Sequence, residues 1–202
     1  LVEQCKPVVF YMGNDARGEY IYKFVSRAVW SNSDIGGGLK AGDKYLNDGT
    51  LYAAIFNEDG SGEWKALIHG QNGLDASNSK LPFSGQDEVL VFARAAGDVL
   101  GATKMDRPEW VTVSPITGDV YVTLTNNTNR GVKDDQPLSA SNPRSYNVDG
   151  KLRGNENGHI IRWAEAGGDH TAMSFEWDIY LFATPYDLAA ENLSQLNDSN
   201  DL

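Results

Sequence analysis

The feature that most constrains the fold is a pair of strand-like segments joined by a short turn, within residues 106–127. Val111 and Val113 alternate with a polar residue, which is the period of a half-buried strand. Residues 115–118 (Pro-Ile-Thr-Gly) supply turn chemistry, because Pro fixes φ and Gly can adopt a positive φ. Residues 119–125 are rich in Val, Tyr and Thr and predict a second strand. We therefore expect an antiparallel β-hairpin here.

Polar residues stand at both ends of this hairpin. Arg107 and Glu109 open its first strand, and Asn126 and Asn127 follow its second. In an antiparallel hairpin these ends lie side by side, so the four residues are expected at one sheet edge. Pro108 is expected to bias Arg107 toward an extended backbone. A cation, a carboxylate and two amides suit an oxyanion and a metal ion, although the two amides could also simply terminate the strand.

The rest of the chain repeats the hairpin pattern. Further strands are predicted at residues 8–12, 20–26, 50–57, 63–68, 158–163 and 175–183. One helix is predicted over residues 84–103, where apolar residues recur at helical spacing and Gly101 provides an end. The Gly-rich stretch 31–48 and the long polar stretch 128–157 are interpreted as connectors, and residues 184–202 as a polar end without a closing strand.

Antiparallel hairpins with one inserted helix indicate an all-β fold. A propeller blade needs about four strands, so seven or eight strands supply about two blades. We therefore expect a partial β-propeller with one inserted helix, in which residues 1–202 are part of a single propeller domain that is incomplete at both ends. A β-sandwich is the competing architecture. The five tryptophans are expected to pack inside the fold: Trp30, Trp64, Trp110, Trp163 and Trp177.

Composition excludes several classes of protein. The net charge of −11 argues against nucleic acid as a partner, and it fits either binding of divalent cations or plain solubility. No apolar run is long enough to span a membrane, and the first residues do not resemble a signal peptide. The single cysteine, Cys5, rules out an internal disulfide framework and a multi-cysteine zinc site.

Several phrases of the chain resemble those of the PhoX-type alkaline phosphatases, a family once called DUF839. The longest phrase is residues 95–110, Ala-Ala-Gly-Asp-Val-Leu-Gly-Ala-Thr-Lys-Met-Asp-Arg-Pro-Glu-Trp. The others are residues 11–17, 124–127, 158–163, 167–172 and 175–178. They follow one another in the order of the family and span nearly the whole chain.

The resemblance implies a periplasmic or extracellular bacterial β-propeller enzyme that hydrolyses small phosphate monoesters with Ca²⁺ and Fe³⁺. It assigns catalytic roles to Arg107, which would bind the substrate phosphate through its planar fork, and to Glu109, which would be a metal ligand. The family's acidic turn usually reads Asp-Asp, whereas this chain has Asn14-Asp15. Asp15 is therefore the expected second metal ligand, with Asn14 as a neutral ligand.

Parts of the family pattern are missing. The Thr-Pro-Trp-Gly-Thr segment with its metal-binding cysteine does not occur, and Cys5 lies in no matching motif, so it is given no metal role. The chain is thus expected to be an internal segment of a longer phosphatase, with the rest of the propeller chain as its partner and little activity alone. His159 and His170 could be metal ligands, but hydrogen-bonded structural roles are favoured.

Two other functions are compatible with the sequence. The first is a calcium-dependent propeller hydrolase of the lactonase or phosphotriesterase type. The second is a non-catalytic, calcium-binding β-module that serves surface interactions. The metal content and the substrate class would separate these alternatives from a phosphatase.

Overall fold

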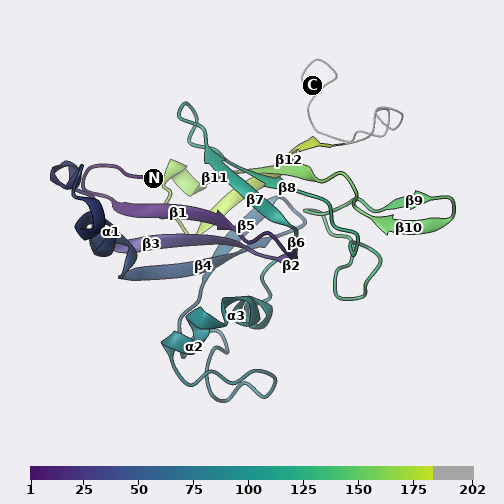
Figure 1. Cartoon of the computed structure of the whole chain (residues 1–202), viewed down its shortest axis with the longest axis horizontal. Coiled ribbons are helices and arrows are strands. Elements are labelled where there is room, and N and C mark those ends of the chain that lie inside the picture. Colours follow the sequence, from purple (N-terminus) through teal and green to yellow (C-terminus); the bar gives the residue numbers. More distant parts are fainter. Residues whose placement is uncertain (184–202) are drawn as a thin grey trace.

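The main element of the fold is an eight-stranded antiparallel sheet. The computed structural model describes residues 1–183, and the strand order in the sheet is β1-β3-β4-β5-β12-β11-β8-β7 (Figure 1). The strands are β1 (Pro7–Gly13), β3 (Ile21–Val29), β4 (Gly49–Phe56), β5 (Ser61–Ala66), β7 (Pro108–Val113), β8 (Val120–Leu124), β11 (His159–Glu165) and β12 (Ser174–Phe182). The expected all-β, antiparallel class is confirmed.

The sheet consists of two four-stranded halves, each with the strand number of a propeller blade. β1-β3-β4-β5 form one half and β7-β8-β11-β12 the other, and they are joined by a short pairing of Ser174 to Glu176 with Ser61 to Glu63. The sheet curls until its edge strands β1 and β7 come close together. A Cβ atom added to Gly13 of β1 would lie 2.6 Å from the carbonyl oxygen of Pro108 in β7.

Aromatic side chains fill the interior of the curled sheet. Trp64, Trp163 and Phe175 are buried there and contact one another with ring centroids 5.1–6.0 Å apart. Trp110, by contrast, is 80% exposed, so the expectation that all five tryptophans pack inside is wrong for this residue. The reason is strand alternation: Val111 takes the inward position on β7, which turns Trp110 outward.

A buried ion pair connects the two halves. Nζ of Lys23 on β3 lies 3.2 Å from Oε2 of Glu165 on β11, and both side chains are fully excluded from solvent. Glu165 also accepts hydrogen bonds from the Tyr11 hydroxyl and from Nε1 of Trp64. Burial lowers the pKa of Lys23 to about 8, and burial also raises the pKa of Glu165.

The predicted helix over residues 84–103 is present but divided. It forms α2 (Gln86–Val91) and α3 (Ala93–Leu100), which are separated at Phe92, where φ is −104° and ψ is 40°. Gly101 ends α3 in the left-handed conformation, with φ of 69°, as the sequence predicts. Figure 1 shows both helices together on one side of the sheet.

A further helix, α1 (Gly38–Leu46), lies in the Gly-rich stretch that was interpreted as a connector, so that interpretation is wrong. Its sequence contains two glycines, which disfavour a helix, and Tyr45 is its only buried residue. The Tyr45 hydroxyl donates a 2.5 Å hydrogen bond to Asp34 and accepts one from the Ser31 N–H, and its ring contacts Trp30. Contacts with the preceding segment therefore hold a helix that local pattern does not predict.

Two small sheets accompany the main one. β2 (Arg17–Glu19) pairs with β6 (Met105–Asp106), and β9 (Tyr146–Val148) pairs with β10 (Lys151–Gly154). The β9-β10 hairpin lies within the polar stretch interpreted as a loop, and Figure 1 shows it projecting at the end opposite α1. Short 3-10 turns lie at η1 (Asn32–Asp34) and η2 (Ala166–Gly168). The predicted polar end, residues 184–202, lies outside the described residues. Within residues 1–183, no helix has the length and apolar character needed to cross a bilayer.

Candidate active site

Arg107 is the joint between two sheets. It follows β6, which pairs with β2, and precedes β7, which pairs with β8. Its φ is 52°, in the left-handed region, so the expected extended backbone is wrong. The chain has one residue in which to turn from one sheet into the other, and this requirement overrides the preference set by Pro108. The turn is held by a hydrogen bond of 3.3 Å from the Thr125 N–H to the Arg107 carbonyl oxygen.

The guanidinium of Arg107 gathers three of the predicted polar residues. Its Nε lies 2.9 Å from Oδ1 of Asp15, and its Nη2 lies 3.1 Å from Oδ2 of the same carboxylate. Nη1 donates to Oδ1 of Asn126 at 2.5 Å, and Nη2 lies 3.9 Å from Oε1 of Glu109. The structure therefore brings together Arg107, Asp15, Glu109 and Asn126 at one rim of the sheet.

This rim is accessible to a ligand. The side chains of Arg107 and Glu109 are each 29% exposed, and that of Asp15 is 45% exposed. A shallow pocket of about 460 Å³ lies beside them and is lined by Tyr11, Met12, Gly13, Asp15, Glu109, Trp110 and Val111. Arg107 already holds a carboxylate through two parallel contacts, which is the geometry in which an arginine also holds a phosphate. In this structure the oxyanion that the fork holds is the carboxylate of Asp15.

Two predicted residues lie apart from this group. Asn14 is exposed in the turn after β1, and its side chain makes no hydrogen bond to any described residue. Asn127 is fully buried, and its Nδ2 donates to Oδ1 of Asp106 at 2.7 Å and to Oε1 of Gln136 at 2.9 Å. Of the two amides left open by the sequence, Asn126 contacts Arg107, whereas Asn127 belongs to the buried structure behind it.

The carboxylates at the rim are suitable ligands for a hard cation, but they are fewer than such a cation needs. Asp15 and Glu109 supply carboxylate oxygens, which Ca²⁺ and ferric iron prefer. Within residues 1–183, however, no three or more His, Cys, Asp or Glu side chains gather as a metal site. Ca²⁺ takes about six to eight oxygen ligands. Asp15 and Glu109 alone do not supply that number of oxygen ligands. Cys5 is exposed, with no metal cluster around it among the described residues.

Both histidines named by the sequence make hydrogen bonds within the fold. Nε2 of His159 lies 2.8 Å from the Ser141 carbonyl oxygen, and burial lowers the pKa of His159. Nδ1 of His170 lies 2.8 Å from the Tyr11 hydroxyl, and burial lowers the pKa of His170 as well. These contacts agree with the structural roles favoured from the sequence.

An ion pair between Asp106 and Arg130 lies directly behind the rim and was not predicted. Asp106 precedes Arg107 in the chain, and that adjacency was the available signal. Arg130 lies in the polar stretch after β8, where nothing in the sequence distinguishes it from a solvated arginine. Its burial, at 2% exposure, depends on the tertiary fold.

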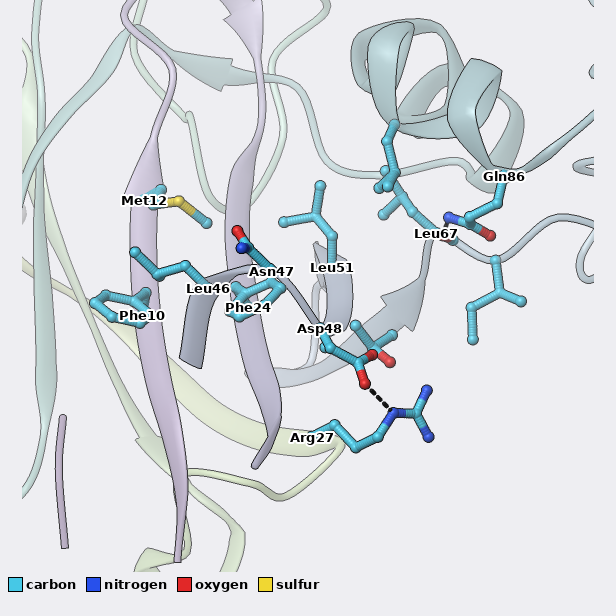
Figure 2. Close-up of a pocket in the computed structure, with 14 residues that line it drawn as sticks. Phe10, Met12, Phe24, Arg27, Leu46, Asn47, Asp48, Leu51, Leu67 and Gln86 are labelled. Atoms are coloured by element: carbon cyan, nitrogen blue, oxygen red, sulfur yellow. Dashed lines mark hydrogen bonds and ion pairs between the residues drawn. The ribbon is translucent and has the colours of Figure 1, made fainter. Parts of the chain in front are cut away.

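A larger pocket, of about 890 Å³, lies on another part of the surface. Figure 2 shows its largely apolar lining, with Phe10, Phe24 and Leu46 among the labelled residues and an ion pair between Arg27 and Asp48. None of the residues around the Arg107 guanidinium lines it. The larger of these two pockets is therefore not the one beside Arg107.

Comparison with known proteins identifies the family. A family model described as alkaline phosphatase PhoX matches residues 1–202. The structure of Pseudomonas fluorescens PhoX in complex with vanadate, a transition state analogue, is 43% identical, with a TM-score of 0.76. The match covers 89% of this chain and 30% of that chain, so this chain spans less than a third of the length of that relative. No curated protein matched the chain. The chain belongs to the PhoX alkaline phosphatase family.

Proposed function

We propose that this chain is part of a metal-dependent phosphatase that hydrolyses phosphate monoesters. The observation that carries the proposal is the grouping of Arg107 with Asp15, Glu109 and Asn126 at one accessible rim. A guanidinium can bind phosphate oxygens, and the carboxylate and amide oxygens beside it can bind metal ions that neutralise the phosphate. Family membership supports the same chemistry, as does the vanadate complex of the Pseudomonas fluorescens relative.

In this proposal Arg107 is the residue that binds the phosphate. Its planar guanidinium can donate two parallel hydrogen bonds to phosphate oxygens and can stabilise the charge that develops there during phosphoryl transfer. The hydrogen bond from Nη1 to Asn126 orients the group. Asp15 occupies Nε and Nη2, so a bound phosphate must replace its carboxylate on that side of the fork.

Glu109 and Asp15 would contribute to the metal centre, with Asn14 as a neutral ligand and Ca²⁺ and Fe³⁺ as the proposed ions. When bound, such ions neutralise negative charge on the phosphate oxygens. We propose that the remaining ligands come from other parts of a longer chain, in which residues 1–202 belong to a single propeller domain. The segment alone is therefore expected to hydrolyse little or no substrate.

The expected setting is the bacterial periplasm or the extracellular space, as for the family. Small phosphate monoesters are the proposed substrates. The net charge of −11 disfavours nucleic acids, because binding a phosphate backbone requires a basic surface.

The test measures binding and turnover separately. Orthovanadate is titrated into the 202-residue chain, and Arg107→Lys is expected to weaken its binding at least tenfold, since a lysine cannot present a planar fork. Arg27→Lys is the matched control, because Arg27 forms a similar exposed pair with Asp48, 2.7 Å from Nε to Oδ2, and should leave the affinity unchanged. Equal affinities of the wild type and Arg107→Lys would contradict the proposal.

Turnover of p-nitrophenyl phosphate is measured with and without added Ca²⁺ and Fe³⁺. Little or no hydrolysis is expected from the segment alone, and substantial turnover would show that its metal site is complete. Hydrolysis of lactones or phosphotriesters with Ca²⁺ alone would favour the alternative hydrolase. Ca²⁺ binding without vanadate binding would favour a non-catalytic module.

A further inference from the structure

Behind Arg107 lies a group of polar side chains that are almost completely excluded from solvent. At its centre, Nε of Arg130 lies 2.7 Å from Oδ1 of Asp106. The same Oδ1 accepts a hydrogen bond from Asn127, and Oδ2 accepts one of 3.1 Å from Nδ2 of Asn155. All four side chains are at most 2% exposed. These residues, Asp106, Arg130, Asn127 and Asn155, are called the Asp106 cluster below.

The guanidinium of Arg130 is held by hydrogen bonds to other parts of the protein. Its Nη1 donates to the Pro137 carbonyl oxygen at 2.7 Å, and its Nη2 donates to the Lys104 carbonyl oxygen at 2.6 Å. Together with the bond to Asp106, these contacts use all three nitrogen atoms. Arg130 is thus a fixed structural cation, held through each of its three nitrogen atoms.

The cluster is joined directly to two of the four residues at the rim, Arg107 and Asn126. Asp106 immediately precedes Arg107, and Asn127 immediately follows Asn126. The backbone of Asn127 is held in turn by two hydrogen bonds to the backbone of Asn155, at 2.6 and 2.9 Å. Arg107 and Asn126 are joined at the rim by the hydrogen bond from Nη1 to Oδ1. The cluster therefore anchors both of the chain segments that carry these residues.

Arg107 needs such an anchor. A left-handed backbone is uncommon for a residue with a side chain and persists where the surroundings leave no alternative. A long arginine side chain also has many rotamers to lose when it is held in one pose. A rigid cluster next to Arg107 in the chain would restrict both its backbone conformation and the rotamers of its side chain.

The composition of the cluster also argues against a purely stabilising role. A buried ion pair is a poor source of stability, because removing two charges from water costs about as much as their attraction returns. Its best-attested use is to specify one geometry among several. We propose that the Asp106 cluster is a positioning device, which fixes Arg107 and Asn126 relative to each other so that the guanidinium fork is preorganised for an oxyanion. Its benefit to catalysis rests on the proposed function.

The test uses a double variant of the 202-residue chain, Asp106→Asn with Arg130→Met, which removes both charges together and leaves no unpaired ion. The matched control is Lys23→Met with Glu165→Gln, which neutralises a second ion pair that is also buried. Melting temperatures of all variants are compared first. If the double variant does not fold, Asn155→Ala replaces it. This variant removes the hydrogen bond from Asn155 to Asp106 and the two that Asn155 Oδ1 accepts from the Asn157 and Gly158 N–H groups, and it leaves the Asp106–Arg130 pair in place.

The decisive readout is the conformation of the rim without ligand. Hydrogen exchange is followed by NMR at Nε–H of Arg107, assigned by its loss in Arg107→Lys, and at the Thr125 amide, which donates to Arg107. In the cluster variant both are expected to exchange at least tenfold faster, whereas the control changes neither, even at an equal loss of melting temperature. Unchanged exchange in the cluster variant, or equal changes in both variants, would overturn the proposal.

Orthovanadate titration then separates the two proposals. We expect the cluster variant to bind at least tenfold more weakly than the wild type. If the wild type and Arg107→Lys bind vanadate equally but the exchange result holds, the positioning role stands and the proposed function fails. If the wild type binds and the cluster variant binds equally well, the proposed function stands and the positioning role fails.

Discussion

The carboxylate of Asp15 occupies two of the donor nitrogens of Arg107, with Oδ1 2.9 Å from Nε and Oδ2 3.1 Å from Nη2. A phosphate bound through the same fork would meet this carboxylate as a competitor. A cation bound beside Asp15 would instead attract the carboxylate and free the fork. Asp15 is thus expected to weaken phosphate binding when no metal is bound and to strengthen phosphate binding when a metal is bound.

Replacement of Asp15 should therefore shift two affinities in opposite directions. Asp15→Asn is expected to tighten phosphate binding about fivefold in the absence of metal, because a like charge near a partly exposed site costs about 1 kcal/mol. The same variant should weaken Ca²⁺ binding. Isothermal titration with phosphate and with Ca²⁺ measures both. Asp48→Asn, which breaks the exposed pair with Arg27, is the control and should change neither.

The left-handed backbone of Arg107 leads to a prediction about stability. Arg107→Gly and Arg107→Ala both remove the guanidinium, but glycine tolerates φ of 52° without steric cost. The glycine variant should be more stable than the alanine variant by about 1 kcal/mol. At Arg27, within strand β3, the order should be reversed, because glycine weakens a regular strand by roughly 0.5–1 kcal/mol. Urea unfolding of the four variants checks this, and the same order at both positions would contradict it.

The buried His159 should make the fold sensitive to mild acid. Burial lowers its pKa in the folded state, so the unfolded state takes up a proton first as the pH falls below about 6.5. Stability is then lost with decreasing pH, by up to about 1.4 kcal/mol between pH 7.5 and pH 5.5. His159→Gln keeps a donor toward Ser141 and removes this titration. Urea unfolding at the two pH values should show the smaller loss in the variant, and parallel losses would be evidence against it.

Close approach of the two sheet edges makes Gly13 intolerant of a side chain. A Cβ atom there would lie 2.6 Å from the Pro108 carbonyl oxygen and 3.0 Å from that of Glu109. Gly13→Ala should cost roughly 1–3 kcal/mol, because backbone atoms of β1 or β7 must move. Gly42 in α1 has open space around it, so Gly42→Ala should be neutral or stabilising by up to about 1 kcal/mol. Thermal unfolding compares the two, and equal effects would indicate that the edges are not in contact.

The parts of the fold predicted from the sequence are those that depend on local pattern. Alternation and turn chemistry define the hairpin of β7 and β8, and antiparallel geometry then places Arg107 beside Asn126. The strand pattern likewise predicts an all-β fold of two four-stranded units.

The remaining features depend on contacts between distant segments. Helix α1 is held by Tyr45, and its glycines give no helical signal. The backbone of Arg107 departs from the preference that Pro108 imposes, because two sheets meet there. Arg130 resembles a solvated residue until the fold buries it against Asp106, 24 positions earlier in the chain.

The joint of one residue between β6 and β7 has a consequence for how this region can vary. Inserting or deleting a residue there would shift β7 by one position and turn Val111 and Val113 toward solvent. It would also carry Glu109 to the other face, away from the guanidinium. The placement of Glu109 beside Arg107 thus depends on the packing of Val111 and Val113 in the interior. We therefore expect a change in length at this point to lower the stability of the fold.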